Sequence, residues 1–175
     1  MNADKDSYGV PRSKSIQTTP AHQLALAAVY YSPLQYMYWY DKPSDSQDEP
    51  ELKFFDDVYT TWDDTKVLQG EVGEFITIAR RKGEEWFIGS ITNNEKRVLS
   101  VSLDFLPEGK NYIAEIYTDG DKSVKTRTKV RVSTYRVSNK TKLNFCLKAS
   151  GGAAVRLVPD DGNIKSVKNY KQQRL

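Results

Sequence analysis

Residues 74–105 read EFITIARRKGEEWFIGSITNNEKRVLSVSLDF, and this stretch decides the fold class of the chain. It contains three runs in which apolar side chains alternate with polar or small ones, separated by breaks at 82–84 and 93–95. A period of two with aromatic and β-branched residues is typical of strands, and short breaks with Gly or Asn are typical of hairpins. The stretch therefore predicts an antiparallel meander. Such a sheet is expected to bury one face and expose the other, so it needs a second layer.

More short alternating runs surround this stretch. They lie at 67–70, 112–118, 129–137, 142–147 and 153–158. Turn-forming segments with Gly, Pro or Asp separate them, at 107–109, 119–121 and 151–152. About eight short strands with such turns favour a mainly β fold, an antiparallel β-sandwich.

A helical segment is predicted before the strands. Thr19 and Pro20 form a helix start, with Thr as the N-cap and Pro at the first helical position. The segment 21–31 is rich in Ala and Leu, and Pro33 is expected to kink or end the helix before it resumes over 34–40. Its apolar residues lie on nearly all sides of the helix, namely Leu24, Leu26, Ala27, Ala28, Val29, Tyr30 and Tyr31. Because one sandwich face is too narrow to cover all of them, we expect this segment to self-associate or to bind a missing domain.

Four parts follow from these patterns. They are an irregular segment at 1–18, a helical segment at 19–59 with a short helix opening at Pro50, a β-sandwich at 60–159, and a basic flexible tail at 160–175. The tail holds Lys165, Lys168, Lys171 and Arg174.

Composition excludes several classes of partner. The net charge of +3 over 175 residues predicts neither a nucleic-acid-binding nor a membrane-surface protein. No run approaches the ~18 apolar residues of a membrane-spanning helix, and residues 1–18 lack the apolar core of a signal peptide. The single cysteine, Cys146, lies between Phe145 and Leu147 and is predicted to be a buried, unreactive thiol in a strand.

Few residues suggest chemistry. His22, the only histidine, has no other ligand type beside it, so a packed or capping role is favoured over catalysis or metal binding. Asp63 and Asp64 are adjacent, and adjacent strand residues point to opposite faces, so a turn or strand-start role is favoured over a carboxylate pair. Asp119-Gly120-Asp121 lacks the spaced ligands of a calcium loop and predicts a hairpin turn.

The remaining motifs assign no catalytic, cofactor-binding or metal-binding residue. Asn139-Lys140-Thr141 fits a glycosylation sequon, and Gly151-Gly152 is too short to cradle a phosphate. The aromatic residues at 30–40 could stack on sugar rings but at helical spacing favour a core or an interface. They are Tyr30, Tyr31, Tyr36, Tyr38, Trp39 and Tyr40.

Six stretches carry a more specific signal. They are QTTPAHQLAL at 17–26, YSPLQ at 31–35, WDDTKVLQGEVG at 62–73, FITIAR at 75–80, WFIGSIT at 86–92 and LDFL at 103–106. In this order, and over about residues 16–158, the chain resembles the C-terminal end of glycoside hydrolase family 97 enzymes, the bacterial α-glucosidases and α-galactosidases. The segment YMYWYDKP at 36–43 differs from the better-known α-glucosidases, so both sugars stay open.

The resemblance implies a place in a larger enzyme. In that family a (β/α)₈ barrel precedes a C-terminal β-sandwich, so 19–31 would be the last barrel helix and the strands from Val67 onward the sandwich. The family's catalytic residues and calcium-binding carboxylates all precede this region, so no cofactor is expected in this chain. Members are typically periplasmic or secreted.

Two functions remain in competition. One is a non-catalytic part that braces the barrel and contributes to oligomerisation, and the other is a carbohydrate-binding module. A binding module needs a coplanar exposed aromatic set, whereas a brace buries Trp62, Trp86 and Tyr117. A complete small enzyme is the weakest reading, because no acid/base pair is identifiable.

Overall fold

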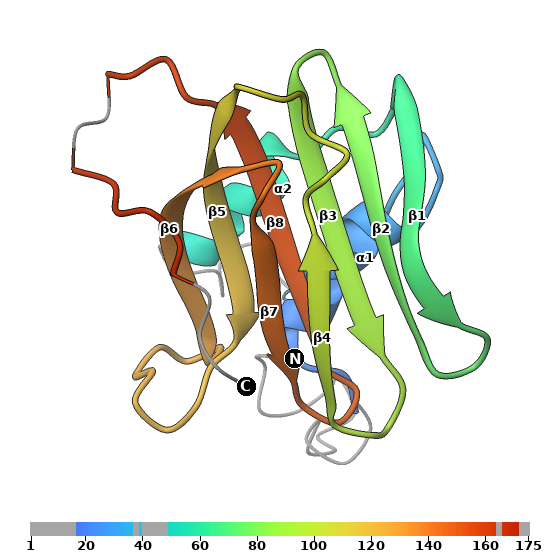
Figure 1. The fold of residues 1–175 in the computed structure, drawn as a ribbon. Coiled ribbons are helices and arrows are strands. Elements are labelled where there is room, and N and C mark those ends of the chain that lie inside the picture. Colours follow the sequence, from blue (N-terminus) through green and yellow to red (C-terminus); the bar gives the residue numbers. More distant parts are fainter. Residues whose placement is uncertain (1–16, 37–38, 40–48, 164–165, 172–175) are drawn as a thin grey trace.

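The computed structural model describes residues 17–36, 39, 49–163 and 166–171. The chain forms three layers, with two helices on one face of a six-stranded sheet and a two-stranded sheet on the other (Figure 1). This arrangement confirms the mainly β, sandwich-like class.

The six-stranded sheet has the order β1-β2-β3-β8-β5-β6, and the small sheet pairs β4 with β7. All of these strand pairs are antiparallel. The strands are β1 (Asp64–Glu71), β2 (Phe75–Lys82), β3 (Glu85–Thr92), β4 (Arg97–Ser102), β5 (Asn111–Asp119), β6 (Val130–Ser138), β7 (Lys142–Leu147) and β8 (Gly152–Pro159).

The predicted meander is only partly correct. β2 and β3 pair as expected, but β4 leaves for the second sheet and pairs with β7, while β8 takes the other edge of β3. Burial explains this choice. Phe87 and Ile88 of β3 are both 0% exposed, whereas Val98 of β4 is 55% exposed and Leu99 is 5% exposed. A strand with one solvent-exposed face fits an outer layer, whereas a strand buried on both faces fits the central layer.

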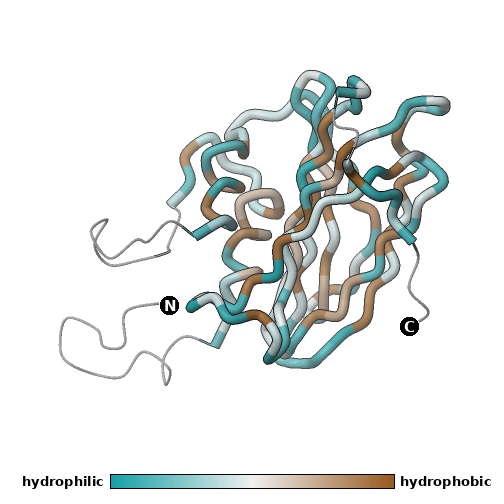
Figure 2. Tube along the Cα trace, turned by 90° about the vertical axis from the view of Figure 1, so that its left-hand side faces the viewer, coloured by the Kyte–Doolittle hydropathy of each residue, from teal (hydrophilic) through white to brown (hydrophobic). Residues whose placement is uncertain are grey.

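The expectation that this sheet would expose one face is therefore wrong for its central strands, because both faces of β3 and β8 are covered. One apolar core lies between the two sheets and includes Trp86, Ile88 and Leu143. A second core lies under the helices and includes Phe54, Phe87 and Tyr117. The edge-on view of Figure 2 places the helices on one side of the large sheet.

Helix α1 (Pro20–Val29) begins as predicted, with the Thr19 side chain accepting a hydrogen bond from the His22 backbone N–H at 3.2 Å. A 3₁₀ turn, η3 (Pro50–Leu52), leads into α2 (Lys53–Asp57). The predicted second helical piece at 34–40 does not form over the described residues 34–36 and 39, whereas Tyr38 and Tyr40 lie outside the described residues. Ser32 Oγ accepts from the Leu34 N–H at 3.2 Å, a local turn that replaces the helix after Pro33.

Two further expectations are corrected. Cys146 is exposed, because it points to the solvent side of β7 while its neighbours Phe145 and Leu147 point inward. The tail expected to be flexible is attached to the sheet at 168–170, where Tyr170 contacts Tyr135 with ring centroids 5.3 Å apart, while most of its described residues are exposed. The Tyr170 hydroxyl also accepts a hydrogen bond from the Asn144 N–H at 3.0 Å. Lys165 and Arg174 lie outside the described residues.

Candidate functional site

The junction between α1 and the large sheet is the candidate site, because it holds the buried charged and polar side chains that join the helical segment to the sandwich. Helix α1 packs directly against the backbone of the large sheet at two glycines. A Cβ on Gly89 would lie 2.5 Å from the Ala25 carbonyl oxygen, and one on Gly152 would lie 2.6 Å from the His22 Cα. Ala21, Leu24 and other small or apolar residues of this helix face are fully buried. Glycines under a small-residue helix face therefore allow close contact.

This packing overturns one earlier premise. We expected one sandwich face to be too narrow for the apolar residues of the helix, yet Leu24 is 0% exposed and Val29 is 9% exposed against the chain's own sheet. Self-association is thus not required to cover the helix itself. The apolar side chains that stay exposed lie at and beyond its C-terminus, with Tyr30 at 60%, Tyr31 at 73% and Tyr36 at 95%.

Arg80 of β2 fixes the C-terminal end of α1. Its Nε donates to the Ala28 carbonyl at 2.6 Å and its Nη2 to the Val29 carbonyl at 2.9 Å. Nη1 donates to Thr65 Oγ1 at 2.8 Å, and the guanidinium carbon lies 5.2 Å from the centre of the Tyr31 ring. Burial lowers the pKa of this guanidinium, which stays charged because the ordinary value is so high. A cation at a helix C-terminus also interacts favourably with the helix dipole.

The other two terminal carbonyls of α1 are satisfied as well. Leu26 O accepts from the Tyr30 N–H at 2.9 Å, and Ala27 O accepts from Gln35 Nε2 at 3.1 Å. The last four carbonyls of a helix lack partners within the helix. In α1 each of these four carbonyls accepts a hydrogen bond from a group outside the helix. The C-terminal turn is therefore a fixed structure rather than a frayed end.

His22 fixes the N-terminal end of α1. The residue is 8% exposed, and Nδ1 lies 3.1 Å from the Gly151 carbonyl, which can only accept, so Nδ1 carries the proton. Beside it the Thr19 N–H donates to the Ser150 carbonyl at 3.0 Å. The structure thus confirms the packed role predicted for His22.

The pKa of His22 is lowered from 6.5 because burial disfavours the imidazolium, against opposing contributions from the Gly151 carbonyl and the charge of Asp119. A folded-state pKa below the unfolded value means that the unfolded chain binds more protons between the two. The contribution of neutral, buried His22 to the free energy of unfolding is therefore fully present above about pH 6.5 and is lost as the pH falls below that value.

We predict that the single imidazole of the folded chain titrates with a midpoint below 6.5, measured by NMR of its ring C–H protons. In urea the midpoint should return to about 6.5. His22→Gln keeps a donor near the Gly151 carbonyl without a titrating group, and should remove the His-dependent stability loss between pH 7.5 and the folded midpoint. A folded midpoint at or above 6.5 would contradict the prediction.

A charged network fixes α2 to the same face of the sheet. Arg156 of β8 lies 2.7 Å from Asp57 and 2.8 Å from Glu85, and Lys53 lies 3.1 Å from Glu115. These carboxylates are thus paired with cations, and the arrangement serves attachment of α2. Within the described part of the chain, no group of three or more His, Cys, Asp or Glu could hold a metal ion.

The remaining candidate residues have structural positions. Asp63 accepts hydrogen bonds from the Gly83 N–H at 2.8 Å and Lys82 Nζ at 3.2 Å, and Asp64 begins β1, which confirms the predicted turn and strand start. Asp119 Oδ2 accepts from the Lys148 and Gly152 N–H groups, at 2.9 and 3.2 Å.

Asp119 ends β5, and Gly120 and Asp121 begin a longer connection, 120–129, to β6, which pairs with β5 antiparallel; the predicted turn is therefore present as the start of a loop rather than as a tight hairpin turn. Asn139 of the sequon is half-buried in the turn between β6 and β7. No helix in the described ranges is long and apolar enough to cross a membrane.

Trp62, Trp86 and Tyr117, whose exposure distinguishes a carbohydrate-binding module from a brace, do not form one coplanar surface. Trp86 is 4% exposed between the sheets, and Tyr117 is 1% exposed on the opposite face under the helices. Trp62 is half-buried with its ring centroid 5.5 Å from that of Phe87. These three side chains therefore do not form the coplanar exposed set that a binding module needs.

Sequence reasoning missed Arg80 and Arg156, the residues that attach the helices. In the alternating pattern of β2, the Arg80 side chain lies on the same face as Ile76 and Ile78. This pattern could have indicated a buried guanidinium. The carbonyls that it binds belong to residues some fifty positions earlier, and no local pattern shows them.

The architecture is an antiparallel β-sandwich with a helix fixed on its larger sheet, and residues 61–158 of it match the family described as "Glycosyl-hydrolase 97 C-terminal, oligomerisation". The chain belongs to this family.

Individual relatives agree. A retaining alpha-galactosidase of Bacteroides thetaiotaomicron is 34% identical over 158 residues, which are 89% of this chain and 23% of that protein. A glycoside hydrolase family 97 enzyme from Pseudoalteromonas sp. strain K8, solved with acarbose, is 37% identical with a TM-score of 0.74 over 82% of this chain and 23% of that one. A beta-arabinopyranosidase structure is 25% identical with a TM-score of 0.66, over 85% and 22%. The chain thus spans about a quarter of the length of these proteins.

Proposed function

We propose that this chain is the non-catalytic C-terminal part of a family 97 α-glycoside hydrolase, and that it braces the catalytic barrel through its helical segment. One observation carries the proposal: α1 is fixed to the sandwich at both ends, by His22 and Arg80. A helix held this firmly can transmit the position of one domain to the next. The retaining alpha-galactosidase supports an α-galactoside as the parent substrate, with an α-glucoside as the alternative.

The surface that would meet the barrel lies at the C-terminal end of α1 and in the residues that follow it. We name it the outer helix surface and define it as Leu26, Tyr30, Tyr31, Leu34 and Tyr36. Most of it lines a shallow hollow of about 240 Å³. Leu34 is 72% exposed, so this surface is an exposed apolar patch beside a rigid helix. Large aromatic side chains of this kind are enriched at protein interfaces. We therefore assign this surface to a contact with the barrel, on the strength of its exposed aromatic side chains.

A chimera tests the bracing role. Residues 19–158 replace the matching region of the Bacteroides alpha-galactosidase, and activity on nitrophenyl α-galactoside is followed during heating. Tyr30→Ala with Tyr36→Ala should shorten the half-life of the chimera, because lost barrel contacts leave the sandwich less firmly attached. The isolated chain should keep its unfolding midpoint, since both side chains are exposed.

Val132→Ala, at a valine that is 38% exposed on the far strand β6, is the matched control and should have no effect. An unchanged half-life in the tyrosine variant would overturn the bracing role.

The isolated chain should hydrolyse neither nitrophenyl α-galactoside nor α-glucoside. Turnover that a single Asp or Glu substitution abolishes would contradict the non-catalytic assignment.

A further inference from the structure

A second apolar surface lies at the hairpin of β1 and β2, away from the outer helix surface. It is a hollow of about 540 Å³ whose apolar lining includes Val67, Val72, Phe75, Ile76 and Ile91. We name it the hairpin hollow. Val72 is fully exposed at the turn and Val67 is 67% exposed, so apolar side chains here face solvent.

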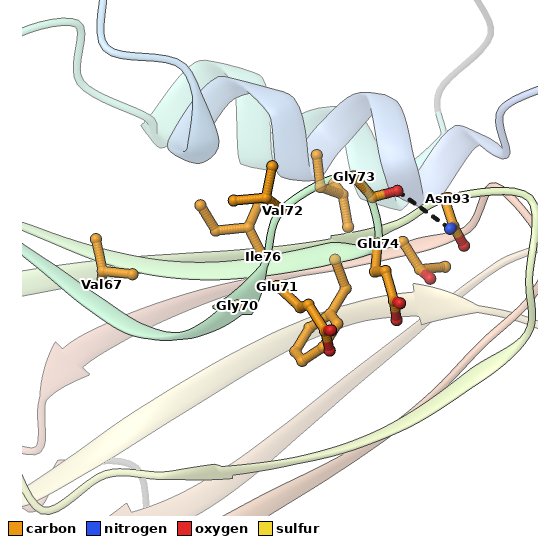
Figure 3. Close-up of a pocket in the computed structure, with 11 residues that line it drawn as sticks. Val67, Gly70, Glu71, Val72, Gly73, Glu74, Ile76 and Asn93 are labelled. Carbon is orange, nitrogen blue, oxygen red and sulfur yellow. Dashed lines mark hydrogen bonds between the residues drawn. The ribbon is translucent and has the colours of Figure 1, made fainter.

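Figure 3 shows how these side chains lie. Val67, Val72 and Ile76 point to the helix side of the hairpin, whereas the carboxylates of Glu71 and Glu74 point to the opposite side. Glu74 Oε2 is paired with Arg97 at 2.9 Å. Both glutamates also line the hollow, but their carboxylates point away from the side on which Val67, Val72 and Ile76 lie.

The two edges of the large sheet differ. The β6 edge is covered near Arg136, whose N–H donates to the Lys168 carbonyl at 2.9 Å and whose carbonyl accepts from the Tyr170 N–H at 2.9 Å. Within the described residues β1 pairs with β2 alone, so its outer edge has no strand neighbour. An open edge is a ready surface for association, and natural proteins normally cover or blunt it.

We infer that the hairpin hollow and the adjoining β1 edge bind a second copy of this chain about a two-fold axis. The family description names oligomerisation, and its match covers 61–158, which excludes α1. Within that range the exposed large hydrophobic residues are Val67, Val72, Val98 and Val132. Only the hollow at the hairpin brings two of them together.

A two-fold contact fits this shape. Val72 projects from the hairpin beside an apolar hollow, so the Val72 side chain of each copy enters the hollow of the other, as a self-complementary interface requires. A standard interface uses about 20–30 residues a side, so the eleven lining residues need the β1 edge in addition. The bulge between Val67 and Gln69 breaks the regular edge, so side-chain packing rather than one continuous sheet carries the contact.

The test is the oligomeric state of the 175-residue chain, measured by light scattering over a wide concentration range. The unmodified chain should dimerise. Val72→Glu should raise the dimer dissociation constant at least about tenfold, because a carboxylate would enter an apolar hollow. Circular dichroism confirms folding, which an exposed turn residue should not affect.

Val132→Glu on β6 and Val98→Glu on β4 are matched controls, since each puts the same charge at another exposed valine. Both should leave the dimer unchanged. A monomeric unmodified chain, or a dimer that either control disrupts as much as Val72→Glu does, would overturn the inference. The result is independent of the chimera experiment, because the two tests use different surfaces and different readouts.

Discussion

Trp86→Ala is expected to lower the free energy of unfolding by about 3–5 kcal/mol, the range for removing a large aromatic side chain from a core. Trp86 is 4% exposed in the core between the sheets. Its ring lies against Phe105 with centroids 4.7 Å apart, and it stands between Arg81 of β2 and Leu157 of β8 in the sheet. Truncation would therefore leave a cavity in the core between the sheets.

Denaturant unfolding of the variant and the unmodified chain measures this loss. Tyr36→Ala is the matched control, because it also truncates an aromatic ring but at a side chain that is 95% exposed. Its effect should stay within about 0.5 kcal/mol. A loss below about 1 kcal/mol for Trp86→Ala would mean that the ring contributes little to the core, against its burial in the structure.

The strands were predictable because their signal is local. The alternation in residues 74–105 placed three strands within a few residues of their observed bounds, and 142–147 was predicted with its observed limits. The helix start at Thr19 and Pro20 was equally local, since a cap and a proline at the first position are read from adjacent residues.

Pairing was less predictable, because it depends on competition between distant segments. Residues 98–103 were predicted to form the next strand of a meander, yet β8 takes the edge of β3. β8 contains Ala153, Ala154 and Val155, all at most 1% exposed, and so it fits a position covered on both sides. The sequence of β4 alone does not reveal that a better-suited strand follows some fifty residues later.

The site was the least predictable part. The helix has no basic residue in its own last turn, so nothing in residues 20–29 indicates how its C-terminal carbonyls are satisfied. The guanidinium comes from β2 and reaches them only because Gly89 and Gly152 let the helix lie close to the sheet. Close approach and the buried charge depend on each other, and both are properties of the folded molecule.

Arg80→Ala is therefore expected to lower the free energy of unfolding by about 2–4 kcal/mol. Hydrogen bonds to a charged group contribute about 1.5–3 kcal/mol each, and the variant removes two of them from buried carbonyls. The contributions are not additive, because water can reach part of the space that the side chain leaves. The loss should be concentrated at α1, where Ala28 and Val29 lose their partner.

Denaturant unfolding measures the total effect, and amide hydrogen exchange locates it. Faster exchange in 20–29, with the central strands unchanged, would show that the helix opens from the sheet by itself. Arg80→Lys keeps the charge but not the planar fork, so it should recover less than half of the loss. Arg81→Ala is the control at the adjacent position, where the side chain is half-buried and donates to the Gly83 carbonyl in its own hairpin. It should cost less than about 1 kcal/mol. Equal losses for Arg80→Ala and Arg81→Ala, or full recovery with lysine, would show that the forked contact does not hold the helix to the sheet.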